Sequence, residues 1–257
     1  MKSLWLHLYS MLVAAGILLL VVTGALGNGH RAFAAVVGVL VAILASSLIL
    51  SGSQPWLRRL GLVALAGVAA DALLGLAANP KSPMASMAHA FLAPLILSAV
   101  VAIVLGTSRS WQRDPIFLQD QGWPSLRSVA RNTLVVVVIQ VALGAAFRYG
   151  SISVMTHILG ALVVVVFVLT LVVLVTLMPE HPTLRPAAIT LGVVTFVQIF
   201  LGLTVVSMGT AKANKAMAAA FSVAHIATGA ITLAATLVVA LEIWRNVRPA
   251  GDQGFTS

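Results

Sequence analysis

Four of the six histidines in this chain share a sequence setting that is typical of a ligand site. Each stands near the beginning of a long apolar segment and is followed four residues later by alanine or glycine. Residues four apart lie on the same face of a helix, so a small residue there leaves room for a flat macrocycle against the backbone. The histidines are His30, His89, His157 and His225, and the small residues are Ala34, Ala93, Ala161 and Gly229.

The rest of the composition limits the chemistry open to these histidines. The chain has no cysteine, which excludes disulfides, thiolate ligands and iron–sulfur clusters. Neutral imidazole binds zinc, copper or iron, and two imidazoles can bind a haem iron from opposite sides. Zinc needs further ligands, and Asp71 is the only extra candidate within an apolar segment. We therefore interpret the four histidines as haem ligands, with zinc and simple helix packing as weaker alternatives.

The apolar segments that must position these histidines predict an all-α integral membrane protein. Hydrophobic residues make up 60% of the chain and charged residues 8%, whereas a soluble domain is about a quarter charged. The apolar runs are long enough to cross a bilayer as helices, and they lack the alternation of a β-barrel. We predict eight transmembrane helices, of which the first is retained rather than cleaved as a signal peptide. They cover roughly residues 5–26, 31–50, 58–77, 84–106, 129–149, 152–177, 186–207 and 216–244.

The longest connection, residues 107–128, divides the chain into two halves, 1–106 and 129–257. A short motif that ends in glycine recurs near the end of each odd-numbered predicted helix, and the next helix carries one of the four histidines. The motif reads Leu20-Val-Val-Thr-Gly24, Asp71-Ala-Leu-Leu-Gly75, Gln140-Val-Ala-Leu-Gly144 and Gln198-Ile-Phe-Leu-Gly202. We interpret the chain as two pseudo-repeated four-helix bundles, with a histidine pair across each bundle core. Gln140 and Gln198 are then candidate cofactor contacts.

The distribution of positive charge predicts the orientation of the helices in the membrane. The net charge is +9, and ten of the fifteen lysines and arginines fall on the side that carries both termini. Short cytoplasmic loops are enriched in such residues, so we expect cytoplasmic termini and outward-facing histidine pairs. This predicts a multi-pass protein of a cell membrane, such as a bacterial inner membrane, with the lipid bilayer as partner and no nucleic-acid binding. His7 and His181 fall on the cytoplasmic side and are expected to be interfacial rather than functional.

Cations near the four histidines are candidates to bind the propionate groups of haem. The cations on this side are Arg31, Lys81, Arg148, Lys212 and Lys215. Arg148, nine residues before His157, is the best propionate partner, and membrane anchoring is the alternative role for the lysines. Three roles are open to Asp71: it is neutral, it pairs with Arg31 or Lys81, or it accepts a hydrogen bond from a histidine.

In this arrangement the chain resembles the haem A synthase family of cytochrome oxidase assembly proteins over residues 5–245. The most similar stretches are residues 140–148 followed by His157, residues 198–204 followed by His225, and the pair His30-Arg31. The resemblance implies two similar four-helix halves, with haem b between His157 and His225. It implies that His30 and His89 bind a second haem, which is haem O, haem A or haem b. It also implies oxidation of a haem O methyl group to a formyl group, with partners among respiratory-chain or oxidase-assembly membrane proteins.

The chain departs from this family in the connection between its first two predicted helices. The connection is short, it carries no cysteine pair, and Gly27 stands where the family has a glutamate three residues before the first histidine. The competing hypothesis is a non-catalytic bis-histidine haem b protein that transfers electrons or handles haem. A third hypothesis is a transporter that relays protons through Asp71 and the histidines. Transporters often contain a pair of broken helices, whereas Pro94 is the only proline deep within a predicted helix here.

Overall fold

The computed structural model describes residues 2–26, 30–77, 82–120, 122–210 and 214–249, and these residues are almost entirely helical. Eight of their helices are long and apolar enough to cross a membrane, which confirms the predicted all-α fold and the number of spans. They are α1 (Lys2–Leu26), α2 (His30–Leu50), α3 (Pro55–Ala77), α4 (Pro83–Thr107), α6 (Leu126–Arg148), α7 (Val154–Leu177), α8 (Leu184–Thr210) and α9 (Lys215–Asn246). The shorter elements are helix α5 (Arg109–Gln112) and the strands β1 (Leu118–Gln119) and β2 (Val247–Arg248).

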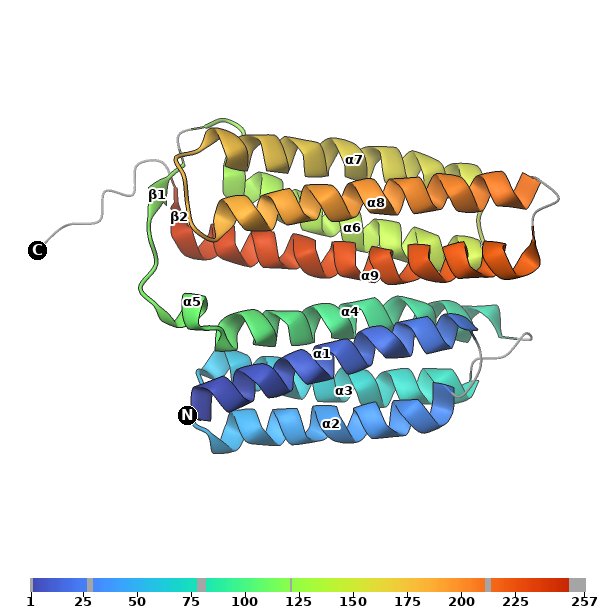
Figure 1. Ribbon diagram of the computed structural model, residues 1–257, viewed down its shortest axis with the longest axis horizontal. Helices are drawn as coiled ribbons and strands as arrows, with labels where there is room; N and C mark the ends of the chain where they lie inside the picture. Colours follow the sequence, from blue (N-terminus) through green and yellow to red (C-terminus); the bar gives the residue numbers. More distant parts are fainter. Residues whose placement is uncertain (1, 27–29, 78–81, 121, 211–213, 250–257) are drawn as a thin grey trace, which may run out of the picture.

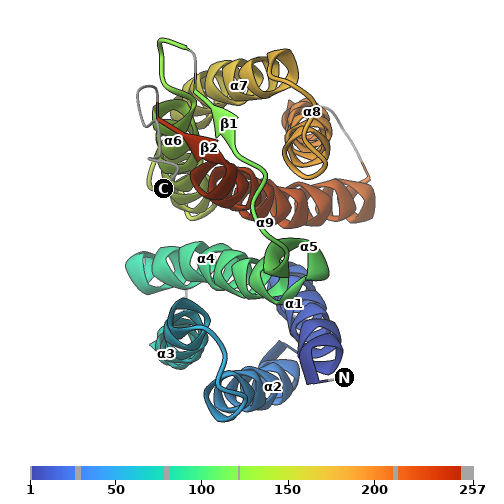
Figure 2. The same cartoon turned by 90° about the vertical axis from the view of Figure 1, so that its left-hand side faces the viewer.

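The eight long helices form two four-helix bundles that lie side by side (Figure 1). Helices α1 to α4 form the first bundle and α6 to α9 the second, and each helix packs against the next one in its bundle. The bundles meet mainly through α4 and α9, with further contacts of α1 with α9 and of α4 with α6. A view along the helices shows α4 of the first bundle facing α9 of the second where the two bundles meet (Figure 2). The C-terminal end of α6 lies next to the first bundle, since Arg148 there contacts the Ala25 carbonyl.

The helices run back and forth, so that α1, α3, α6 and α8 end where α2, α4, α7 and α9 begin (Figure 1). We call this the histidine end, because His30, His89, His157 and His225 all lie near it. The turn between α6 and α7 contains Gly150, whose φ of 72° is in the left-handed region that glycine adopts without a steric penalty. This turn lets the polypeptide reverse direction between Arg148 and His157.

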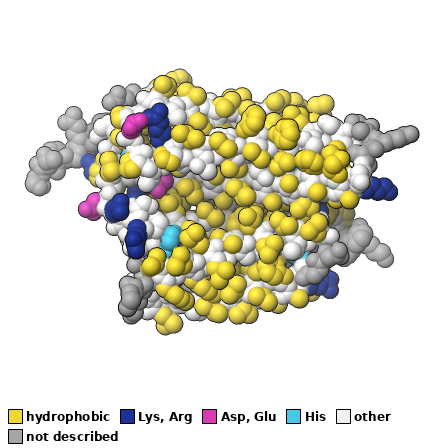
Figure 3. All heavy atoms as spheres, in the orientation of Figure 1, with side chains coloured by type: hydrophobic (Ala, Val, Ile, Leu, Met, Phe, Trp, Pro, Cys, Tyr) yellow, Lys and Arg dark blue, Asp and Glu magenta, His cyan; other side chains and the backbone are white. Residues whose placement is uncertain are grey.

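Apolar side chains cover the outside of both bundles, while the charged side chains gather at the two ends (Figure 3). Several large apolar residues are more than 60% exposed, among them Leu76, Phe196 and Leu203. Helices α4 and α9, which lie between the bundles, are the most buried of the spans. A surface of this kind is stable only in contact with lipid, so the chain is a multi-pass membrane protein.

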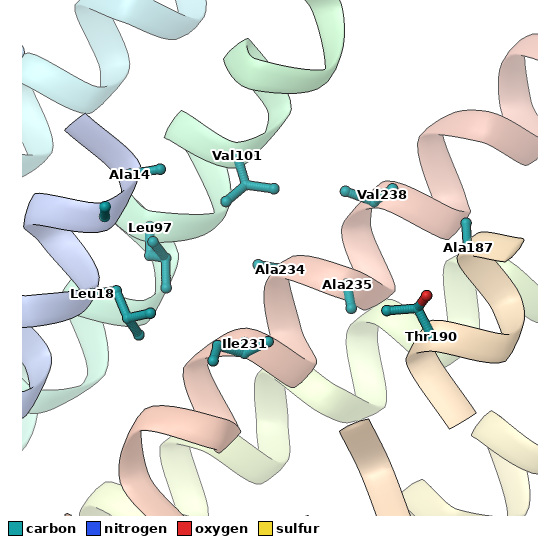
Figure 4. A pocket seen from close by; sticks show the side chains of 11 residues that line it. Ala14, Leu18, Leu97, Val101, Ala187, Thr190, Ile231, Ala234, Ala235 and Val238 are labelled. Atoms are coloured by element: carbon teal, nitrogen blue, oxygen red, sulfur yellow. The ribbon is translucent and has the colours of Figure 1, made fainter. Parts of the chain in front are cut away.

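Each bundle has an apolar core of its own, and a cleft of about 420 Å³ remains between them. Figure 4 shows that α1 and α4 line one side of this cleft and α8 and α9 the other. The lining residues are Ala14, Ala15, Leu18, Leu97, Val101, Ala187, Thr190, Ile231, Ala234, Ala235 and Val238. None of these is titratable, so the cleft is a packing feature at the seam between the bundles and does not belong to the histidine end.

The connection between the two halves is attached to the C-terminal end of α9, opposite the histidine end. Strand β1 of the connection pairs in parallel with β2, which directly follows α9. The Arg245 guanidinium donates hydrogen bonds to the backbone carbonyls of Trp111 and Arg113, and it stacks over the Trp111 ring at 4.6 Å. The described part of residues 107–128 thus holds the two bundles together at one end.

Candidate functional site

The structure brings the four histidines together as two pairs at the histidine end. His30 of α2 faces His89 of α4, with ring centroids 5.8 Å apart and an interplanar angle of 76°. His157 of α7 faces His225 of α9, with ring centroids 6.3 Å apart and an interplanar angle of 88°. Each pair combines the second and fourth helix of its bundle, which are diagonal neighbours, so each pair lies across a bundle core.

The spacing of the rings fits two axial ligands of a single metal atom. Two imidazoles bound on opposite sides of one iron atom, with metal–nitrogen bonds of about 2.0 Å, have ring centroids about 6 Å apart. The two observed distances lie on either side of that value. Within the described ranges, no three side chains of histidine, cysteine, aspartate or glutamate are grouped so as to hold a metal ion. The centroid distances of both pairs are therefore compatible with two imidazoles on opposite sides of one metal atom.

A glycine of the preceding helix lies directly against each histidine ring. A Cβ atom at Gly24 or Gly75 would stand 3.1 or 3.2 Å from Cε1 of His30 or His89. The corresponding distances to the second pair are 3.3 Å from Gly144 and 2.9 Å from Gly202. These separations are shorter than ordinary van der Waals contact, so a larger residue would push the ring away from the helix. A glycine recurs in the helix before every paired histidine, and this recurrence is the sequence feature that corresponds to the contact with the ring.

Hydrogen bonds at Nδ1 determine which nitrogen of the ring is available to a metal. The Nδ1–H group of His89 donates to the Asp71 carboxylate at 2.9 Å and to the Asp71 backbone carbonyl at 3.1 Å. The Nδ1–H group of His225 donates to the Gln198 backbone carbonyl at 3.2 Å. Because these acceptors fix the proton on Nδ1, the neutral rings present a lone pair at Nε2, as a metal ligand must. Of the three roles considered for Asp71, the structure selects that of acceptor for a histidine.

The other two histidines also have a polar partner at Nδ1. The Thr23 hydroxyl donates to the Leu20 carbonyl at 3.2 Å, so its oxygen is free to accept from His30 Nδ1 at 3.3 Å. In the second bundle, Gln140 Nε2 lies 3.1 Å from His157 Nδ1. The same Nε2 donates to the His157 backbone carbonyl at 3.0 Å, so the amide presents its donor side and His157 Nδ1 is the acceptor.

The two glutamines of the recurring motif have hydrogen-bonding capacity that no described residue uses. Three buried side-chain oxygens in the described ranges have no partner, and two of them are Oε1 of Gln140 and Gln198. A buried polar atom without a partner costs about 1–3 kcal/mol. Gln198 Nε2 also lies 3.4 Å from His225 Nε2. Gly229 packs closely on Gln198, since a Cβ there would stand 3.1 Å from its Nε2.

The first histidine pair opens into a cavity of about 520 Å³, a typical size for a small-molecule site. His30, His89 and Asp71 line it, together with Ala34 and Ala93, the small residues expected to leave room for a macrocycle. The remaining lining is mostly apolar. The cavity therefore offers two imidazoles and a carboxylate to an otherwise apolar ligand.

Two arginines contribute to this cavity, and one of them comes from the other bundle. Arg31 belongs to α2, whereas Arg148 is the last residue of α6 and donates from Nη2 to the Ala25 carbonyl at 3.4 Å. The sequence predicts that Arg148 lies beside the C-terminal pair, because it is close to His157 along the chain. The structure instead has its side chain at the N-terminal cavity. Helix α6 contacts α4, so the C-terminal end of α6 lies close enough to the first bundle for Arg148 to reach this cavity.

The remaining candidate residues contribute less to either pair in the structure. Ala161 is half-buried in α7, and Lys215 is exposed at the start of α9. Lys81, Lys212 and Gly27 lie outside the described residues.

His7 and His181 lie at the opposite end of the molecule and have structural contacts. His7 Nδ1 donates to the Val104 carbonyl at 3.1 Å. His181 is only 5% exposed and lies in the connection between α7 and α8. Its Nδ1 accepts from the backbone N–H groups of Thr183 and Leu184 at the start of α8, where the helix has free donors, and its Nε2 is 3.2 Å from the Ile116 carbonyl.

Fold and site together define a multi-pass helical membrane protein with two histidine pairs at one end of two adjacent bundles. No protein-family model matches the chain, and no curated protein matches it.

Proposed function

We propose that this protein binds two haem groups, with haem b between His157 and His225 and a second haem between His30 and His89. The observation that carries the proposal is the spacing of the two pairs, 5.8 and 6.3 Å between ring centroids, with every ring seated on a glycine. The second haem is haem O, haem A or haem b. Purified protein that contains no haem after expression in a haem-sufficient host would contradict the proposal.

The residues around the pairs also suit the other parts of a haem molecule. Its propionates need cations, and Arg31 and Arg148 stand at the N-terminal cavity. Its macrocycle needs an apolar slot, and Ala34 and Ala93 keep the cavity walls close to the helix backbone. When bound, haem supplies one-electron transfer and oxygen chemistry, while the protein binds it, orients it and sets its reduction potential.

For the activity, we propose oxidation of the haem O methyl group to a formyl group, as the resemblance to the haem A synthase family implies. Conversion of methyl to formyl with oxygen from water releases four electrons and four protons. The electrons pass to an oxidised membrane carrier of the quinone class. Such a protein works with respiratory-chain or oxidase-assembly membrane proteins, which use the product.

A second candidate is a non-catalytic haem b protein that transfers electrons or handles haem. The observation that favours it is Gly27, which stands where the haem A synthase family has a glutamate. Glycine has no side chain that accepts a proton, so this position cannot assist removal of protons from the methyl group.

Expression in a host that supplies haem O distinguishes these two candidates by the type of haem that can then be extracted. The synthase candidate predicts haem A, whereas the non-catalytic candidate predicts little or none because Gly27 replaces the glutamate, and mass spectrometry of the extracted haem measures it. Gly27→Glu restores the family residue and is expected to raise conversion, with His89→Ala as the inactive control. Robust conversion by the unaltered protein would reject the non-catalytic candidate and establish the synthase reaction.

We also propose that both termini are cytoplasmic and that the histidine end faces outwards in the cell membrane, as in a bacterial inner membrane. The basis is the excess of arginine and lysine in the connections at the end opposite the histidines. A periplasmically active reporter fused after Ser257 should therefore be inactive, whereas the same reporter inserted after Gly150 should be active. Activity of the reporter after Ser257 would reverse this topology.

A further inference from the structure

The four paired histidines differ in the polar group that lies beside Nδ1. His89 donates to the carboxylate of Asp71 at 2.9 Å, whereas His225 donates to a backbone carbonyl and His30 lies beside a hydroxyl. Asp71 occupies the same place in its motif as Gln140 and Gln198, four residues before the glycine that touches the ring. One position of the recurring motif therefore carries a carboxyl group in the first bundle and an amide in the second.

We propose that Asp71 is a positioning residue that strengthens His89 as an iron ligand and lowers the reduction potential of the haem in the N-terminal half. The proposal rests on the proposed haem-binding function. A carboxylate that accepts from Nδ1–H gives the imidazole partial imidazolate character and makes Nε2 a more basic ligand. A more basic ligand stabilises ferric iron more than ferrous iron, so the potential falls.

The surroundings of the hydrogen bond between Asp71 and His89 favour a large effect on the reduction potential. The side chains of Asp71 and His89 are only 18% and 23% exposed, so little water screens the interaction. Arg31 and Arg148 also line the cavity and act in the opposite direction, because cations favour the ferrous form. Both arginines are exposed, however, so solvent and ions screen their charge more strongly than that of Asp71.

Asp71→Asn separates the charge from the hydrogen bond. Asparagine has nearly the same shape and keeps an oxygen that accepts from His89 Nδ1, so the fold and the haem content should stay at the level of the unaltered protein. The midpoint potential of the N-terminal haem should rise by about 59 mV or more, which is a tenfold change in the ratio of ferrous to ferric affinity.

A spectroelectrochemical titration of the purified holoprotein measures this shift. The C-terminal haem is an internal reference, and His89→Ala identifies the N-terminal component because only that component should disappear. Asp114→Asn is the matched control, since it makes the same charge change at an exposed position in the connection at the far end.

The outcomes separate the inference from the function on which it rests. A shift confined to the N-terminal haem in Asp71→Asn supports the inference. Unchanged potentials in a variant that still holds both haems would overturn it and leave haem binding intact. Loss of the N-terminal haem in Asp71→Asn, with the C-terminal haem retained, would also overturn it, because Asp71 would then act in haem retention. Absence of haem in the unaltered protein would refute the proposed function itself.

Discussion

Replacement of His157 or His225 by alanine is expected to abolish the low-spin haem spectrum of the C-terminal half. Low-spin haem requires a strong ligand on both faces of the iron, and each of these histidines supplies one face of the proposed site. Removal of one ligand leaves iron with a vacant or water-bound face, so the haem becomes high-spin or dissociates. Absorption and electron paramagnetic resonance spectra, normalised to protein, measure the change.

The control for this experiment is His7→Ala. His7 also lies in a membrane helix, but it bonds to the Val104 carbonyl at the opposite end of the first bundle. His181→Ala is a poor control, because His181 is buried and accepts hydrogen bonds from the start of α8. Low-spin spectra identical to those of the unaltered protein in both His157→Ala and His225→Ala would mean that these residues only pack helices.

The N-terminal pair should behave differently in the same measurements. Its cavity of about 520 Å³ suits a substrate or an exchangeable haem, so we expect lower occupancy than in the C-terminal half. Either His30→Ala or His89→Ala should still remove the haem that is present.

Gly202→Ala should lower the haem content of the C-terminal half by about tenfold, which corresponds to about 1.4 kcal/mol of binding free energy. The added Cβ atom would stand 2.9 Å from Cε1 of His225, so the ring must move away from α8 and out of the position in which it would hold a haem iron. The substitution has no comparable cost for the helix itself, because alanine favours helix by about 1 kcal/mol over glycine. Haem content per protein, measured by absorption after purification, reports the effect.

Gly209→Ala is the matched control for this substitution. Gly209 lies on the same helix, and a Cβ atom there meets no other atom within 4 Å. Haem content in Gly209→Ala should equal that of the unaltered protein. If Gly202→Ala also keeps its full haem content, the ring of His225 is not held in place by its contact with α8.

The eight spans follow from the sequence because a membrane helix is a local property of the chain. A helix satisfies its own backbone hydrogen bonds, so an apolar run of sufficient length is enough to specify it in lipid. The predicted span that begins near residue 58 shows the limit of this rule, since α3 begins at Pro55 and includes polar positions before the apolar run. Proline fits the first turn of a helix, where its missing N–H group is not needed.

The sequence also predicts that each of the four histidines lies in the first half of its helix, after a recurring motif in the helix before it. Their pairing follows from four-helix packing, in which the second and fourth helices face each other across the core. The motif alone did not reveal that its glycines touch the rings, because contact between two helices depends on their rotation and separation.

Only the tertiary structure decided the partners of Asp71, Arg148 and His181. Asp71 had three possible roles in the sequence, and the position of α4 beside α3 selected the hydrogen bond to His89. Arg148 is close to His157 along the chain, yet the packing of α6 on α4 directs it to the N-terminal cavity. A long side chain at a helix end reaches in several directions, and the neighbouring helix that it meets depends on how the bundles dock. Hydropathy determined which segments cross the membrane, and the docking of α4 against α9 and α6 determined which polar groups share a site.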